Sequence, residues 1–409
     1  MKKCLLFIFL LSSFFSVSQT NSGDLETYLN NVISSVPGDG TNKFVNPTNI
    51  QLNSWNTIIT DILSGNISSA RTTADTFNYQ IVEYTNTAFT TQKVFYVLEE
   101  KSPQSNYWGT YAFAKNPTRE LILQAPHIKY DTNTGKQAIY SFVRLANRAL
   151  LLSGTHRCNS SSQSSCSGTT SACTSSSQPF KISDMAHNAV TAFQKTTEAL
   201  YNTVSNSFFI QLHGFSKRSS DPYVIMSNGT TNTPSGRDYA LDLRNGLASI
   251  DGSLTFKLGH IDNWTRLLGT TNTQGRFINS SSNACTTSAT TSSGRFVHVE
   301  QEKSKLRENS TGWAKMYQAL KNTFSETTNI DDFSKHVFFK TENPFSSNIS
   351  FTGKNISKFA IYNALGKLII EQKIVNNKVN LDTKNYISGV YFLKVQTNKG
   401  SFSKKLLRE

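Results

Sequence analysis

Short runs of alternating apolar and polar residues fill the C-terminal end of the chain, residues 343–409. The clearest runs are Phe359–Tyr362, Lys367–Ile370 and Val390–Val395, with turn-forming residues at Asn363–Gly366 and Ile387–Gly389. Alternation with a period of two is typical of strands with one buried face, and such turns connect neighbouring strands. We therefore predict a small all-β antiparallel sandwich over residues 343–409.

Several short motifs in this region follow one another in a characteristic order. They are Asn343-Pro344, Ile361-Tyr362-Asn363, Gly366-Lys367, Leu381, Gly389–Phe392 and Lys404-Lys405-Leu406. Together they closely resemble the type A C-terminal sorting domain of the type IX (Por) secretion system of Gram-negative bacteria. The resemblance implies an exported protein that interacts with the type IX secretion machinery through residues 343–409. The alternative is an ordinary terminal sandwich that binds sugar or protein, because folds are reused for many functions.

The N-terminal end has the pattern of a cleaved signal peptide, residues 1–18. A basic start precedes the apolar residues 5–17, and the small residues Ser16-Val17-Ser18 precede an expected mature N-terminus at Gln19. The apolar run is too short to span a membrane comfortably, and no other run is long and apolar enough. We therefore expect a secreted or cell-surface protein that passes through the periplasm and has no transmembrane segment.

The positive charge of the chain is concentrated in the same C-terminal region. The formal net charge is +14 at pH 7, and residues 343–409 contribute 11 Lys/Arg and 3 Asp/Glu, which is +8. A nucleic-acid-binding surface would need a cluster of Lys and Arg with interleaved aromatic residues, and the rest of the sequence has none. The composition therefore argues against nucleic acid as a partner.

Four cysteines follow the signal peptide: Cys158, Cys166, Cys173 and Cys285. An even number in an exported chain indicates disulfides, for which three connectivities are possible. The Ser/Thr-rich stretch Asn159–Gln178 is too polar to pack by itself, so covalent links would restrain it. A zinc cluster is the competing interpretation, although no Cys-x2-Cys pair supports it.

The middle of the chain predicts three successive regions. Residues 19–75 form an N-terminal helical segment, residues 76–324 an α/β domain, and residues 325–342 a linker. The predicted strands are Gln80–Tyr84, Val94–Leu98, Thr110–Ala114, Leu121–Gln124, Phe208–Leu212 and Arg295–Val299, and the predicted helices are Lys136–Leu152, Ile182–Val204 and Trp313–Phe324. Thr134 is expected to cap the first helix and Ser183 or Asp184 the second, while Arg237–Leu247 is compatible with helix or strand. Strands first and alternating elements later indicate a mixed β-sheet flanked by helices.

Polar side chains of metal-ligand type follow three of these strands. His127 follows the fourth predicted strand, His213 the fifth and Glu300 the last. Ligands bind beyond the carboxyl ends of strands in an open α/β sheet, so these side chains converge if the strands are neighbours. Two imidazoles and a carboxylate can hold zinc with one position open to water, whose pKa the metal lowers. We expect Glu300 to act as the catalytic base with Glu302 in reserve, and Arg157 to steady an oxyanion or hold a substrate carboxylate.

Three segments carry a second, more remote resemblance, which covers residues 75–320. They are Pro126-His127 with Asp131, Leu212-His213-Gly214, and His298-Val299-Glu300 followed by Lys305-Leu306-Arg307. They look like the zinc amidohydrolases related to N-formylglutamate amidohydrolase, whose general fold bacteriophage poly-γ-glutamate hydrolase and the metallocarboxypeptidases share. The resemblance implies a zinc-carboxypeptidase-like fold, zinc held by His127, Asp131 and His213, and Glu300 as a catalytic residue. Asp131 lies four residues after His127, against three in metallocarboxypeptidases, so orienting the His127 ring is its alternative role.

The other histidines are weaker candidates. His156 opens the cysteine-rich stretch and can line the same cleft, whereas His187 is expected to pack against or cap a helix. His260, His298 and His336 are expected to be structural, although His298 faces away from Val299 and can reach the site.

The motifs predict an exported zinc-dependent hydrolase of amide bonds that acts on a peptide, a peptidoglycan stem or a γ-glutamyl polymer. Each motif also has a structural explanation, as a loop residue, a strand-ending turn or a solvated helix start. Two other functions stay open: a cell-surface binding or adhesin module that keeps the fold without the metal, and a glycan-processing enzyme with paired carboxylates. The hydrolase hypothesis requires the ring nitrogens of His127 and His213 and a carboxylate oxygen of Asp131 to meet around one point.

Overall fold

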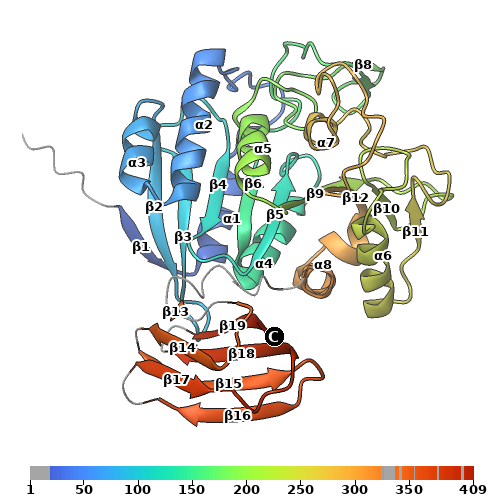
Figure 1. Ribbon diagram of the computed structural model, residues 1–409. Helices are drawn as coiled ribbons and strands as arrows, with labels where there is room; N and C mark the ends of the chain where they lie inside the picture. The colour runs from blue at the N-terminus through green and yellow to red at the C-terminus, as the bar shows by residue number, and fades with distance from the viewer. Residues whose placement is uncertain are drawn as a thin grey trace, which may run out of the picture. The chain divides into compact units, whose positions relative to one another are not determined.

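The computed structural model describes residues 19–324, 326, 337–339, 343–353, 355–374, 377–397 and 400–409. The predicted signal peptide, residues 1–18, and His336 lie outside the described residues. The chain divides into two compact units, Met1–Ser325 and Glu326–Glu409, whose elements are labelled in Figure 1.

A mixed β-sheet forms the centre of the first unit. Its strands are β1 (Thr20–Gly23), β2 (Tyr79–Asn86), β3 (Lys93–Glu100), β4 (Thr110–Ala114), β5 (Arg119–Ala125), β6 (Asn147–Leu152), β9 (Phe208–Phe215), β10 (Val224–Ser227), β11 (Phe256–Leu258) and β12 (Phe296–Glu302). They pair in the order β1-β2-β3-β4-β6-β5-β9-β12-β10-β11. The neighbours β6, β5, β9 and β12 run parallel, while β4 and β10 run antiparallel to β6 and β12. The predicted mixed sheet is therefore confirmed.

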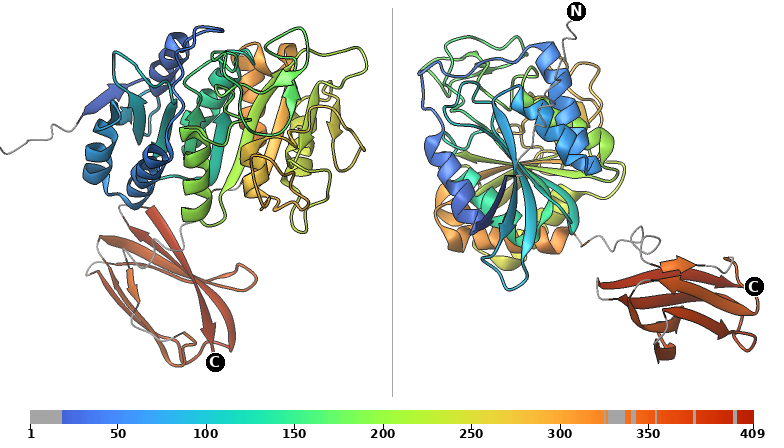
Figure 2. Two further views of the ribbon diagram at one scale, coloured as in Figure 1. Left: turned by 90° about the horizontal axis from the view of Figure 1, so that it is seen from above. Right: turned by 90° about the vertical axis from the view of Figure 1, so that its left-hand side faces the viewer.

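Helices cover both faces of this sheet, as Figure 2 shows. One apolar cluster joins the sheet to α1 (Leu25–Ser35), α4 (Thr134–Leu145), α6 (Tyr239–Ile250) and α8 (Ser310–Thr323). A second joins it to α2 (Asn49–Ser64), α3 (Ile67–Asp75), α5 (Ala192–Thr203) and α7 (Thr273–Ile278). Because both faces are covered, the central strands are buried on both sides and read as continuous apolar runs.

The predicted helix Lys136–Leu152 is wrong in its second half. The helix α4 ends at Leu145, Ala146 adopts a left-handed conformation with φ of 46°, and the chain continues as β6. Leu150 faces one apolar cluster and Leu151 the other, so this run is a strand buried on both sides. A short apolar run does not distinguish such a strand from a buried helix.

The predicted helix starts also differ from the observed ones. Asn133, with no side-chain cap hydrogen bond, occupies the position before α4, and Thr134 Oγ1 donates to a backbone carbonyl instead. The second helix, α5, begins ten residues later than predicted, and Thr191 caps it by accepting from the Gln194 backbone N–H at 3.0 Å. Asp184 is free for another role as a result. The ambiguous segment at 237–247 is the helix α6.

Two disulfides hold the cysteine-rich stretch. Cys158 is bonded to Cys173, and Cys166 to Cys285 in the loop after α7. The stretch has little regular structure apart from the short strands β7 (Thr169–Thr170) and β8 (Gln178–Pro179). The prediction of disulfides is confirmed, and the structure selects one of the three connectivities.

Removing the Cys166–Cys285 disulfide should destabilise the protein more than removing Cys158–Cys173. The two links join residues 119 and 15 positions apart. The unfolded chain gains more entropy when a longer loop is opened, and the expected losses are about 5 and about 3 kcal/mol. Urea unfolding of the Cys166→Ser/Cys285→Ser and Cys158→Ser/Cys173→Ser variants measures both losses. Equal losses, or the reverse order, would contradict the loop-length argument.

The second unit is an antiparallel sandwich. Its strands are β13 (Val337–Phe339), β14 (Asn348–Gly353), β15 (Ile356–Asn363), β16 (Leu368–Lys373), β17 (Lys378–Asp382), β18 (Gly389–Thr397) and β19 (Gly400–Arg408). They form two sheets, β13-β14-β17 and β16-β15-β18-β19. Phe351 and Val379 of one sheet share an apolar core with Phe359 and Leu393 of the other, which confirms the predicted all-β fold. The strand β13 lies inside the predicted linker 325–342, which is therefore not free of secondary structure.

No helix in the described part of the chain has both the length and the apolar character that crossing a membrane requires.

Candidate functional site

The parallel strands β5, β9 and β12 bring the predicted site residues to one edge of the sheet. His127 follows β5, and His213 lies near the end of β9. Glu300 pairs in register with His213 across β9 and β12. The predicted convergence of the strand ends therefore occurs. Two details differ: β9 continues to Phe215 and β12 to Glu302, so His213 and Glu300 lie within their strands.

A tight turn brings Asp131 to the same place. The Asp131 backbone N–H donates to the His127 carbonyl at 2.8 Å, and the Thr134 backbone N–H donates to the Asp131 carbonyl at 3.0 Å. The four-residue spacing between Asp131 and His127 is thus absorbed by the turn that leads into α4.

Three ligand-type atoms form a triangle with equal sides. The Nδ1 of His127, the Nδ1 of His213 and the Oδ2 of Asp131 lie 3.2 Å from one another. All three side chains are buried. Ligand atoms about 2.1 Å from a tetrahedral zinc ion are about 3.4 Å apart, so the triangle has the size of three zinc ligands.

Asp184 orients the His127 ring. Its Oδ1 lies 2.8 Å from the His127 Nε2. Burial alone would raise the pKa of Asp184, but the positive groups Arg157, His187 and His127 outweigh it and hold that pKa well below its usual value. An ionised carboxylate only accepts, so the proton of a neutral His127 is on Nε2 and its Nδ1 presents a lone pair.

A chain of buried amides orients the His213 ring in the same sense. The Gln274 Nε2 donates to the Met185 backbone carbonyl at 2.8 Å, which leaves the Gln274 Oε1 to accept from the Gln211 Nε2 at 3.1 Å. The Gln211 Oε1 then lies 2.7 Å from the His213 Nε2. An amide oxygen only accepts, so the proton of a neutral His213 is also on Nε2 and its Nδ1 also presents a lone pair.

Two lone pairs and a carboxylate oxygen therefore face one point, an arrangement that attracts a cation. Burial and Arg157 act to lower the pKa of His127, yet Asp184 and Asp131 outweigh them and raise it. Burial lowers the pKa of His213 to about 4. The surroundings thus favour a positive charge at His127, which either a proton or a metal ion can supply, and the N, N, O donor set is one that zinc prefers. Outer carboxylates and amides that orient such rings are typical of metal sites.

Arg157 reaches the site from the loop after β6. Its Nε and Nη2 donate to the Asp184 Oδ2 at 3.0 and 2.6 Å, which fixes the guanidinium plane. Its Nη1 lies 3.5 Å from the His127 Nδ1. Arg157 thus lies beside the triangle, where it can donate to an oxygen that gains negative charge.

Glu300 and His298 are two buried side chains beside His213, and each has a polar atom without a hydrogen bond among the described residues. One ligand-type atom of each of the three residues lies within 4.8 Å of the others. The Glu300 Oε2 and the His298 Nδ1 have no hydrogen-bond partner among the described residues. Burial, followed by the charge of Asp131, raises the pKa of Glu300 to about 8. Glu300 therefore has the properties of a group that exchanges a proton near neutral pH.

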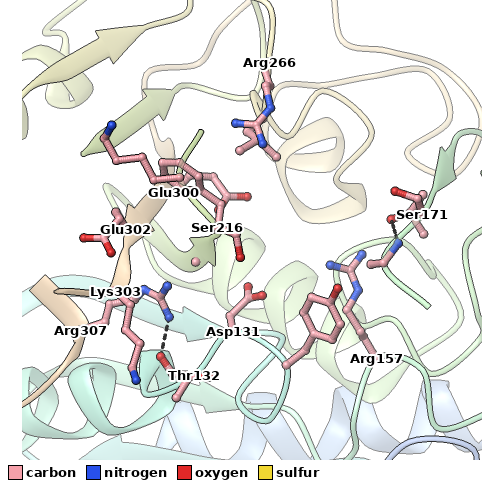
Figure 3. A pocket seen from close by; sticks show the side chains of 17 residues that line it. Asp131, Thr132, Arg157, Ser171, Ser216, Arg266, Glu300, Glu302, Lys303 and Arg307 are labelled. Carbon is pink, nitrogen blue, oxygen red and sulfur yellow. Dashed lines mark hydrogen bonds between the residues drawn. The ribbon is translucent and has the colours of Figure 1, made fainter. Parts of the chain in front are cut away.

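Two cavities meet at this cluster. One, of about 560 Å³, is lined by Asp131, Arg157 and Glu300 and by a wall of cations; we call it the basic chamber. The cations of this wall are Lys217, Arg266, Lys303 and Arg307. Figure 3 labels the last three of them and the acidic residues around the cavity. The other, of about 450 Å³, is lined by His127, His187, His213, His298 and several threonines; we call it the histidine chamber. Both are lined by Arg157, Thr170, Leu267 and Glu300.

The remaining predicted residues lie around the site. His156 lines neither chamber. It stacks edge-on against Tyr130, and the nearby Cys158 sulfur is taken by its disulfide. His187 stacks on Phe180 with ring centres 3.8 Å apart and contacts Asp184. His260 pairs with Asp238 at the start of α6, which fits its predicted structural role.

Glu302, the reserve base, lines the basic chamber, but its carboxylate is occupied. It accepts from the backbone N–H and the hydroxyl of Ser304 and so caps the short π-helical turn η1 (Lys303–Arg307). Burial acts to raise the pKa of Glu302, but hydrogen bonds from Ser304, together with other groups, lower it overall.

Sequence reasoning missed Asp184, Gln211 and the part played by His298. Gln211 and His213 are two apart in one strand, as are His298 and Glu300, so each pair faces the same side of the sheet. That alternation of polar residues in apolar strands was a usable signal. Asp184 gave a weaker one, an acid three residues before His187.

Comparisons with known proteins bear on the second unit. No curated protein matches the sequence of this chain. Residues 343–409 match the family model of the secretion system C-terminal sorting domain, whereas the amidohydrolase resemblance of residues 75–320 finds no support. The prediction for the tail is confirmed. The chain therefore carries a type IX secretion sorting domain and is an exported protein, with a secreted or cell-surface destination.

Proposed function

We propose that this protein is an exported zinc-dependent hydrolase of amide bonds. The observation that carries the proposal is the triangle of His127 Nδ1, His213 Nδ1 and Asp131 Oδ2, with 3.2 Å sides and both rings oriented to present lone pairs. Zinc bound there by three protein ligands would supply a water made acidic enough to react at neutral pH.

The chain's own groups have complementary roles in this proposal. Glu300 accepts a proton from the reacting water, since its Oε2 has no partner among the described residues. Arg157 donates to the oxygen that becomes negative when an amide carbonyl is attacked, and its two hydrogen bonds to the Asp184 Oδ2 hold it in place. Asp184 and Gln211 keep the two rings in position.

Metal analysis and a hydrolysis assay of the mature protein test this function. We expect close to one zinc per chain, and release of amino groups from a panel of peptides and N-acyl amino acids. Chelation should abolish turnover, and added zinc should restore it. A folded protein without zinc, or turnover that chelators do not affect, would contradict the proposal.

A further inference from the structure

One buried cation of the basic chamber forms no close ion pair with any carboxylate of the described residues. The Arg307 side chain is only 4% exposed. Its Nε donates to the Gln301 carbonyl at 3.0 Å and its Nη1 to the Thr132 carbonyl. Its Nη2 has no hydrogen bond, and no carboxylate forms an ion pair with it, within the described part of the chain.

The other cations of the chamber differ from Arg307. Arg157 is paired with Asp184, Arg266 with Asp221 at 2.7 Å, and Lys303 with Glu308 at 3.1 Å. Lys217, the remaining cation, is half-buried and donates to a backbone carbonyl. Among the described residues, Arg307 is therefore the fully buried cation of this wall that forms no ion pair. The charges of Asp131, Glu300, Glu302 and Glu308 act on it only from beyond ion-pair distance.

The position of Arg307 depends on a glycine next to a candidate metal ligand. A Cβ atom on Gly214 would lie 2.2 to 2.6 Å from the Cζ, Nη1 and Nη2 of Arg307. The missing side chain thus makes room for the guanidinium over the backbone beside His213. Figure 3 shows Arg307 on the same side of the chamber as Glu302 and Lys303, near Thr132.

A buried guanidinium that forms no ion pair is costly unless an anion binds it. Removing the cation from water is unfavourable, and hydrogen bonds to neutral carbonyls offset only part of this loss. A carboxylate that accepted from Nη2 would form a charge-assisted hydrogen bond, the strong kind. The planar guanidinium is well suited to this group.

We propose that Arg307 binds a carboxylate of the substrate in the basic chamber. The bond to be cleaved then lies beside an anionic unit, with the other part of the substrate in the histidine chamber, whose threonine-lined wall is neutral. The inference rests on the proposed function for its reaction, but carboxylate binding can be measured without turnover.

Titration of the zinc-loaded mature protein with N-acetyl-L-alanine and with its neutral carboxamide tests the assignment. We expect the acid to bind at least about tenfold more tightly, because one charge-assisted hydrogen bond is worth this much. Arg307→Gln should remove the preference. Lys303→Gln, which removes the same charge from an exposed side chain of the same wall, should keep it. Inorganic phosphate should bind more weakly than the acid.

Equal binding of acid and carboxamide by the wild type would overturn the assignment, as would tighter binding of phosphate or an unchanged preference in Arg307→Gln. If Arg307→Gln does not fold, the preference for the acid over the carboxamide is measured in Arg307→Lys and in the wild type, and this comparison tests the assignment. If the protein binds zinc and hydrolyses amides but does not prefer the acid over the carboxamide, only the proposed role of Arg307 is refuted. Absence of zinc would refute the proposed function, and the titration repeated on the metal-free protein would still test the carboxylate site.

Discussion

Replacing His127 and His213 with alanine should remove zinc from the protein completely. Each substitution deletes one of the three atoms that face a common point, and Asp131 alone cannot hold the ion. Metal analysis of the purified variant measures the loss directly. Zinc that binds the folded state also stabilises it, so zinc should raise the melting temperature of the wild type and leave that of the double variant unchanged.

Two single variants sharpen this result. Asp184→Asn keeps all three ligands but removes the carboxylate that orients the His127 ring and pairs with Arg157 and His187, so we expect zinc to bind about 10- to 100-fold more weakly. His260→Ala removes a buried histidine that pairs with Asp238 away from the triangle, and it should retain zinc. Full zinc in the double variant, or a loss in His260→Ala, would show that the metal is bound elsewhere.

Replacing Glu300 with glutamine should lower kcat by about 10²- to 10⁴-fold while zinc stays bound. Glutamine keeps the shape of the side chain but cannot accept a proton, and general-base catalysis contributes a factor of this size. Burial and the Asp131 charge raise the pKa of Glu300, which shows that its charged form is disfavoured in the fold. The variant should therefore be at least as stable as the wild type, as expected for a residue kept for function.

Glu302→Gln is the matched control. It makes the same chemical change two residues away, on a carboxylate that already accepts two hydrogen bonds from Ser304. We expect little change in kcat and a small loss of stability, since a cap of η1 is weakened. Loss of turnover in Glu302→Gln with normal turnover in Glu300→Gln would exchange the roles of the two residues.

Local patterns predicted much of the fold. The strands β2 to β5, β9 and β12 and the helix α8 lie close to their predicted positions, because alternation and helical spacing reflect the burial of each element. The predicted helix at 182–204 failed in its first half. There the side chain of Asp184 contacts Arg157, His127 and His187 in place of capping a helix. Such long-range contacts leave no periodic signal.

The candidate site was predictable only in part for the same reason. His127, His213 and Glu300 stand out because they occur at the ends of apolar strands, which is a local feature. The adjacency of β5, β9 and β12 that unites them is a property of the sheet. Arg307 lies in a charged stretch whose sequence suggests a solvated helix, yet Gly214 of another strand makes room to bury it.

By itself, the sequence determined the export of this protein and the fold of its tail, because the sorting motifs and the alternating strands are encoded in a contiguous segment. It also named His127, Asp131 and His213 as candidate metal ligands. Only the tertiary structure decided that two ring nitrogens and a carboxylate oxygen meet at 3.2 Å, and which cysteines pair. The physical reason is that ligand geometry depends on the order of strands in the sheet and on buried hydrogen bonds between distant segments.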